Sequence, residues 1–248
     1  IETCVTYFIS RKKPIATMCA GIDFMRRCLG NDLLARETKE LTAEEFCFDA
    51  DRNIYYTPAF RKTGSYLQGH PSLKDVPGVD MSTGSLGQGI SAANGMAVAA
   101  KINGDTYRVY TVLGDGEIEE GQVWEAAMFA AHYKLDNLCA VVDWNGLQID
   151  GKITDVMSSL PIDEKFAAFG WNVINVDAHN FDSLRDGFEQ AKECKGKPTV
   201  LVAKSVKGKG VSFMENQASW HGVAPNDEQH KQAIEELDKA LEELGGKM

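Results

Sequence analysis

The stretch RVYTVLGDG, residues 108–116, joins a short apolar, β-branched run to an aspartate flanked by glycines. Residues 108–113 are typical of a buried strand, and residues 117–133 (EIEEGQVWEAAMFAAHY) carry apolar positions at helical spacing. The sequence therefore predicts a strand, a tight turn at Gly114–Gly116 and a helix, which is the local unit of a parallel α/β sheet.

The same alternation continues on both sides of this unit. We predict further strands at residues 138–142, 171–176 and 199–202, and helices at 85–101, 182–192 and 227–244. The helix at 85–101 is rich in Gly, Ala and Ser, which permits a close approach to another element. The helix at 227–244 is amphipathic and is expected to pack through one apolar stripe (Ala233, Ile234, Leu237, Ala240, Leu241, Leu244). The expected fold is a three-layer α/β sandwich with a mostly parallel sheet.

A chain of 248 residues can bury one substantial core. Residues 57–248 are expected to form one domain, and the first 56 residues, which show no convincing period, are assigned to helix within that domain. The net charge of −10 argues against a nucleic-acid binder. No apolar run is long enough to span a membrane and no signal peptide opens the chain, so we expect a cytoplasmic protein. The six scattered cysteines form no C-x-x-C pair and are expected to be reduced thiols.

Asp115 indicates a metal site. A glycine-flanked turn at a helix N-terminus favours an anion such as phosphate, but a carboxylate there would repel it unless a divalent cation lay between them. Mg²⁺ prefers oxygen ligands. Asn145 and Leu147 leave the end of the next predicted strand, where open α/β sheets bind ligands, and can offer an amide oxygen and a backbone carbonyl. A G-D-G on its own is more often a plain strand-to-helix turn than a metal site.

The pair formed by Gly114-Asp115-Gly116 and Asn145 resembles the thiamine diphosphate signature, and the wider sequence resembles the transketolases. From about Phe60 to Pro225, four blocks follow the order of that family: Gln68-Gly69-His70-Pro71, STGSLGQG (82–89), GDGEIEEG (114–121) and Ser219-Trp220-His221-Gly222. The resemblance implies the thiamine diphosphate-binding fold, with the diphosphate held through Mg²⁺ or another divalent cation by Asp115, Asn145 and the carbonyl of Leu147.

The resemblance also implies roles for other residues. Those expected to contact the cofactor, in addition to Asp115 and Asn145, are Gly84, Ser85, Leu86, Gly114, Gly116, Glu117, Lys207 and His221. Those expected to act in catalysis are His70, near the donor's C1 hydroxyl, His221, at the reaction centre, and Glu120 and Glu125, in a proton network at a subunit interface. Taken singly, each has an ordinary structural reading, as a glycine-rich packing turn, a loop histidine, a solvated basic loop or a helix-surface glutamate.

The implied function is transfer of a glycolaldehyde unit from a ketose phosphate to an aldose phosphate, the chemistry of the pentose phosphate pathway. Full-length family members carry a pyrimidine-binding domain, and some are split into two polypeptides. The length of this chain fits the first, so a C-terminal subunit with the pyrimidine-binding domain is the expected partner, with self-association into a heterotetramer.

The sequence departs from the family pattern before Gln68. The family has His-Pro-Gly-Gly and Ser-Lys-Gly-His segments there, whereas the five histidines of this chain are His70, His132, His179, His221 and His230. Divergence, an altered N-terminus and a sequence error such as a frameshift all remain open. We predict cofactor binding with weak ketol transfer, because the missing histidines would move protons and orient hydroxyls. The alternatives are the α chain of a 2-oxo-acid dehydrogenase, a deoxyxylulose-phosphate synthase and a catalytically silent scaffold subunit.

Overall fold

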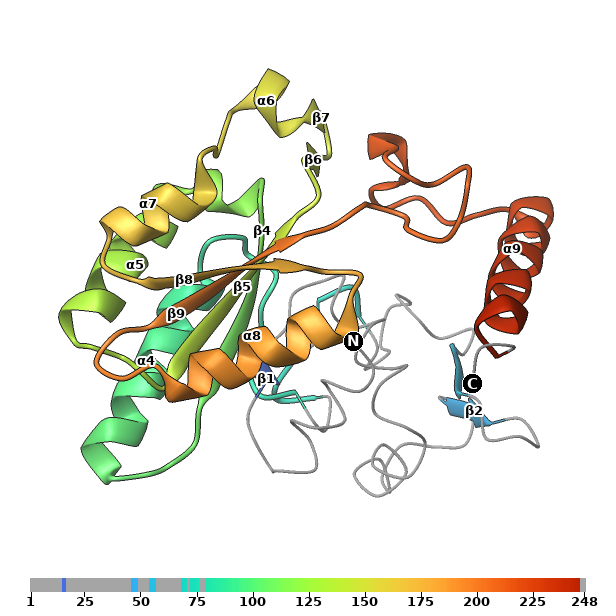
Figure 1. Cartoon of the computed structure of the whole chain (residues 1–248). Helices are drawn as coiled ribbons and strands as arrows, with labels where there is room; N and C mark the ends of the chain where they lie inside the picture. The colour runs from blue at the N-terminus through green and yellow to red at the C-terminus, as the bar shows by residue number, and fades with distance from the viewer. Residues whose placement is uncertain are drawn as a thin grey trace.

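The centre of the molecule is a parallel sheet (Figure 1). The computed structural model describes residues 15–16, 46–48, 54–56, 68–70, 72–75 and 79–245. Within these ranges the sheet has five strands in the order β1-β4-β5-β9-β8, all parallel. They are β1 (Ile15–Ala16), β4 (Val109–Gly114), β5 (Leu138–Trp144), β8 (Asn172–Asp177) and β9 (Thr199–Lys204). Because the strands run in one direction, their carboxyl ends lie along one edge, and the loops that leave them meet there.

Helices cover both faces of this sheet, which confirms the three-layer α/β fold. One face packs against α4 (Gly89–Asn103), α5 (Gly121–His132) and α7 (Ile162–Ala168), and the other against α8 (Phe181–Glu193), the orange helix in Figure 1. The alternation of side chains along β9 builds both layers. Val200 and Val202 belong to the first core cluster, and Leu201 and Ala203 to the second.

The predicted strands after residue 107 are all present, but the helix predicted at 117–133 is two elements. A 3₁₀ turn, η1 (Glu117–Glu119), is followed by Glu120 with extended backbone (ψ 126°), and α5 begins at Gly121. The reason is the side chain of Glu117, which accepts backbone N–H groups from Gly87 and from Gly114. These bonds hold the first turn against the strand end, so the chain changes direction at Glu120 before the helix starts.

The small residues of α4 allow the close approach that the sequence predicts. Ala93 and Ala97 are buried, and the side chain of Asn94 donates to the carbonyl of Ala126 in α5 (2.9 Å). The helix starts at Gly89, later than predicted, because residues 85–88 form a turn that needs Gly87 at a positive φ of 83°.

The N-terminal prediction of helix is wrong wherever the structure describes that segment. Residues 15–16 form β1, and β2 (Phe46–Phe48) pairs with β3 (Ile54–Tyr56) as an antiparallel ladder. Aromatic and β-branched residues favour such extended pairing. The rest of the first 56 residues lies outside the described ranges.

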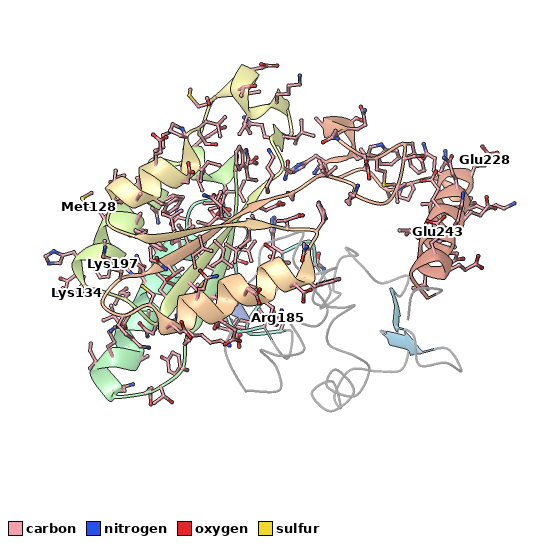
Figure 2. All side chains as sticks on the ribbon, viewed as in Figure 1. Met128, Lys134, Arg185, Lys197, Glu228 and Glu243 are labelled. Carbon is pink, nitrogen blue, oxygen red and sulfur yellow. The ribbon has the colours of Figure 1, made fainter. Side chains whose placement is uncertain are left out.

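Helix α9 (Asp227–Gly245) forms where predicted, but its apolar stripe is mostly exposed. Ala233 is buried, whereas Ile234, Leu237 and Leu241 are 43%, 37% and 67% exposed. The helix lies apart from the sheet, beyond the segment that follows β9, and Figure 2 labels Glu228 and Glu243 along it. It is attached by Glu236, which accepts from the backbone and hydroxyl of Ser212 (both 2.6 Å), rather than by packing on the core. No helix within the described residues is long and apolar enough to cross a membrane.

Candidate functional site

Asp115 lies at the carboxyl edge of the sheet and joins the loops that follow β4 and β5. Its side chain is 1% exposed. One carboxylate oxygen accepts the N–H of Gly116 (3.0 Å) and the other accepts the N–H of Gly146 (2.6 Å). Gly146 has a positive φ of 80°, which turns the chain so that its N–H reaches Asp115. The structure therefore brings together the two segments that the sequence predicts to form the metal site.

Asn145 is held in one orientation by its neighbours. Its side-chain NH₂ group donates to Asp143 Oδ2 (3.3 Å), and its amide oxygen accepts from the backbone N–H of Leu147 (2.9 Å). The other oxygen of Asp143 accepts from the hydroxyl of Ser205, which follows β9. Three adjacent strand ends thus contribute to one hydrogen-bonded cluster. Leu147 and Gln148 continue into a short hairpin, β6 (Leu147–Gln148) with β7 (Gly151–Lys152), before α6 (Ile153–Val156).

The electrostatics of this cluster suit a divalent cation. Burial raises the pKa of Asp115 to about 6, the negative charge of Asp143 adds to the increase, and the N–H groups of Gly146 and Gly116 oppose it. No lysine or arginine of the described residues forms an ion pair with Asp115. Its two oxygens offer four lone pairs, of which the backbone N–H groups of Gly116, Gly146 and Asp115 itself occupy three, so one is left for a metal; the amide oxygen of Asn145 also keeps one beside its bond to Leu147. These oxygen donors fit Mg²⁺.

Glu117 connects this edge to the glycine-rich turn before α4. Its two carboxylate oxygens accept from Gly87 and Gly114, each at 2.9 Å. Burial raises the pKa of Glu117, while both backbone N–H groups favour its charged form. Gly84–Leu86 therefore lie in a turn that is tied to the G-D-G loop. Of the three, Gly84 has a φ of +123°, and Ser85 and Leu86 are exposed.

His70 lies against this turn. A Cβ atom built at Gly84 would be 2.0 Å from the ring of His70, so only glycine permits their contact. An open pocket of about 330 Å³ lies here, lined by His70, Ser72, Met81, Ser82, Thr83, Ser85, Gln88, Gly89 and Ala92. The structure thus places His70 and Ser85, two predicted site residues, at one pocket. The Pro71 that follows His70 in the quoted block lies outside the described residues.

Lys207 and His221 form a basic pair in the segment that follows β9. Partial burial and the positive charge of Lys207 lower the pKa of His221. Both residues are held by local structure. The carbonyl of Lys207 accepts from Asn216 (2.9 Å), and His221 follows a 3₁₀ turn, η2 (Ala218–Trp220), whose Trp220 donates to the carbonyl of Phe213 (3.0 Å). The positive charge of Lys207 and the ring N–H of a mainly neutral His221 together suit an anion.

The two remaining predicted residues, Glu120 and Glu125, lie at the start of α5 and within it. Glu120 is exposed at the start of α5, close enough to Glu117 for its charge to raise the pKa of that buried carboxyl. Glu125 is exposed on α5. Sequence reasoning missed Asp143 and Ser205. A carboxylate at the end of the otherwise apolar run LCAVVDW was the available signal for the first, whereas the contact with Ser205 depends on β9 lying beside β5.

Comparison with known proteins supports the same reading. Residues 49–241 match the family described as transketolase, thiamine diphosphate binding domain. A 6-deoxy-6-sulfo-D-fructose transketolase subunit of Clostridium sp. (strain MSTE9) is 44% identical over 178 residues, 72% of this chain and 65% of that protein. An apulose-4-phosphate transketolase subunit of Phocaeicola vulgatus is 41% identical over 188 residues, 76% of this chain and 66% of that protein. The chain thus spans slightly less than two thirds of these relatives.

Solved structures agree in fold. A transketolase from Campylobacter jejuni superposes with a TM-score of 0.68 at 32% identity, over 71% of this chain and 29% of that one. A transketolase from Pichia stipitis, in complex with sedoheptulose 7-phosphate, gives a TM-score of 0.73 at 27% identity, over 89% and 32% of the two chains. With a family match over more than half its length and the same fold in solved transketolases, this chain belongs to the transketolase, thiamine diphosphate binding domain family.

Proposed function

We propose that this chain is the diphosphate-binding subunit of a transketolase, which transfers a two-carbon glycolaldehyde unit from a ketose phosphate to an aldose phosphate. The observation that carries the proposal is the meeting of Asp115 and Asn145 beside the glycine-rich turn, with the two loops joined by the bond from Gly146 to Asp115. Thiamine diphosphate supplies a nucleophilic carbon and an electron sink for C–C cleavage. The protein has to hold the cofactor, orient the sugars and move protons.

Asp115, Asn145 and the carbonyl of Leu147 would hold Mg²⁺, because they offer hard oxygen donors at a buried negative site. Lys207 would offset the diphosphate charge that Mg²⁺ leaves uncompensated, and the neutral ring of His221 would donate a hydrogen bond to the diphosphate. Backbone groups at Gly84, Ser85, Leu86, Gly114 and Gly116 would lie against the cofactor, with Glu117 keeping the two loops together.

His70 and His221 would serve the sugar. His70 lines the pocket beside Gly84, so it would meet the donor's C1 hydroxyl there. The lowered pKa of His221 favours its neutral form near pH 7, which is the form that can accept a proton. Glu120 and Glu125 are exposed, which fits a proton network shared with a second subunit.

The partner would be a C-terminal transketolase subunit with the pyrimidine-binding domain, in a heterotetramer. Relatives whose names include "subunit" support a second chain. Those relatives are named for a sulfonated fructose and for apulose 4-phosphate, so the donor here is a ketose that carries an anionic group, within or outside the pentose phosphate pathway.

Titration of thiamine diphosphate into the complete complex, with and without Mg²⁺, tests the cofactor site. We expect saturable binding only with the metal, its loss in Asp115→Ala, and no change in the control Asp136→Ala, whose carboxylate pairs with Lys101 (2.7 Å) before the start of β5, at the edge of the sheet opposite the site. Metal-independent binding, or binding that survives Asp115→Ala, would contradict the assignment.

A second assay separates the functions that share this site. The complex is supplied with a ketose phosphate and ribose 5-phosphate, or with pyruvate. Transfer between sugars supports a transketolase, and consumption of pyruvate supports a 2-oxo-acid dehydrogenase or deoxyxylulose-phosphate synthase. We expect transfer with a low kcat, because two histidines of the family pattern are missing from the sequence. Cofactor binding without any turnover would identify a silent scaffold subunit, and family-typical turnover would refute the predicted loss.

A further inference from the structure

His179 anchors the loop that carries Lys207. It follows β8 at the carboxyl edge of the sheet, and its Nε2 atom accepts the backbone N–H of Val206 at 2.8 Å. The loop around His179 is itself fixed. Its backbone N–H donates to Asp177 Oδ1 (2.9 Å), and the N–H of Ala178 donates to the carbonyl of Lys204 (3.0 Å). The imidazole is therefore presented from one strand end to the loop of its neighbour.

The direction of this bond defines the state of the ring. A backbone N–H can only donate, so Nε2 accepts and carries no hydrogen, and the ring hydrogen lies on Nδ1. His179 is exposed, and its acceptor nitrogen binds the backbone amide of Val206, 27 residues away. This bond helps to fix the position of the backbone at Val206.

Val206 directly precedes Lys207, so a bond that fixes the Val206 amide also restrains the backbone of Lys207. Ser205 is tied to β5 through its N–H, which donates to the carbonyl of Trp144 (3.0 Å), and through its hydroxyl bond to Asp143. Beyond Lys207, Gly208 has a φ of +74°, and a Cβ there would lie 2.5 Å from the carbonyl of Met214. The chain is therefore held on the β5 side by Ser205 and on the β8 side by His179.

We propose that His179 is a positioning residue for Lys207. It keeps the loop where the ammonium group can reach the anionic end of the cofactor and touches neither cofactor nor substrate. The inference rests on the proposed function, because it takes the diphosphate as the anion that Lys207 meets. It adds a residue that follows β8 to a site otherwise built from the ends of β4, β5 and β9.

Two conservative variants make a sharp test. In His179→Gln the side-chain oxygen can take the place of Nε2, whereas the shorter side chain of His179→Asn places its amide near Nδ1 and cannot reach Val206. His179→Ala removes the acceptor, and His230→Gln on exposed α9 is the matched control. The measurements, on the complete complex, are hydrogen exchange of the peptide around residues 205–210 and the Kd for thiamine diphosphate with Mg²⁺.

We expect faster exchange at residues 205–210 and a Kd raised about three- to tenfold in His179→Asn and His179→Ala, as for a lost hydrogen bond. His179→Gln should stay within about twofold of the wild type, because it retains a hydrogen bond of ordinary strength. In a Lys207→Ala background, His179→Ala should raise the Kd no further, because its effect acts through Lys207.

Three results would overturn the proposal: unchanged exchange in His179→Ala, equal behaviour of the Gln and Asn variants, or a full effect of His179→Ala in the absence of Lys207. Failure of the proposed function looks different. If the wild type does not bind the diphosphate, both the function and this role of His179 are refuted, whereas binding that Lys207→Ala leaves unchanged refutes only the role of the loop. If His179→Ala does not fold, the comparison of Gln with Asn decides.

Discussion

At the scale of one residue, the buried carboxyl of Asp115 lowers the stability of the metal-free fold when it is ionised. This carboxyl has a pKa of about 6 in the folded chain, against 3.8 for the ordinary group. The folded state therefore binds this proton more tightly than the unfolded state does. Without a metal, stability contributed by the protonated group is present below about pH 4 and is lost as the pH rises towards 6.

We predict that Asp115→Asn removes this loss. Between about pH 4 and pH 7 the metal-free wild type should lose on the order of 2 kcal/mol of stability that the variant does not lose, beside a pH-independent cost in the variant, whose NH₂ group cannot accept one of the two backbone N–H groups. Urea unfolding at a series of pH values, in the presence of a chelator, measures it. Asp238→Asn, on the exposed surface of α9, is the control. A pH-independent difference between wild type and Asp115→Asn would contradict the assignment of the slope to this carboxyl.

The site residues fall into two groups: those recognisable from local sequence and those that depend on contacts between distant parts of the chain. Asp115 and Asn145 could be predicted because each is specified by a local motif, a glycine-flanked turn and a strand end. Asp143 had a local signal that was missed, a carboxylate at the end of an apolar run, whereas Ser205 and His179 could not be predicted, because their contacts require β9 to lie between β5 and β8. Strand order in a sheet depends on long-range packing, and no local pattern in this sequence specifies it.

At the scale of one element, Gly87 determines where α4 begins, because it allows the turn that precedes the helix. It has a φ of +83°, and a Cβ there would lie 2.9 Å from the Cβ of Glu120. Its N–H also donates to Glu117. The sequence predicted the helix but not its start, since the left-handed backbone and the bond to a residue 30 positions away are tertiary features.

We predict opposite effects of alanine at two glycines of this region. Gly87→Ala should destabilise the fold by roughly 1–3 kcal/mol, because it adds a left-handed strain and a close contact with Glu120. Gly95→Ala, in α4 and exposed with no atom within 4 Å, should stabilise it by roughly 0.5–1 kcal/mol. Chemical denaturation of both variants measures the pair. Equal and small effects would show that alanine at residue 87 introduces no strain.

The helix predicted for residues 117–133 was wrong only in its first turn, for a related reason. Apolar spacing indicates which face of a segment is buried, but it does not register a side chain that turns back on its own strand. Glu117 does so, by accepting from Gly114 and Gly87. For α9, the prediction that the apolar stripe packs against the fold was wrong, because the stripe is mostly exposed. Its period gave the right element, yet amphipathicity alone does not say whether the fold brings a surface to cover it.

At the scale of the whole molecule, the site joins the ends of three strands that lie far apart in the sequence. The loops after β4, β5 and β9 meet around Asp115 and Asp143, while the helices that support them pack on both faces of the sheet. A ligand that contacts all three loops must stabilise the entire sheet, because none of these strands can leave without disrupting the site. Binding should therefore appear as a shift of the global unfolding transition.

We predict that Mg²⁺ with thiamine diphosphate raises the Tm of the complex. A ligand at one hundred times its Kd adds about 2.7 kcal/mol, which corresponds to about 5–10 °C for a domain of this size. Thiamine without the diphosphate should give little of this shift, because Asp115, Lys207 and His221 act on the phosphates through metal, charge and a hydrogen bond. Calorimetric scans of the wild type and Asp115→Ala with each ligand separate the two contributions. An equal shift with thiamine alone would show that the thiamine rings provide the binding energy. It would refute the proposal that the diphosphate is the group that joins the three loops.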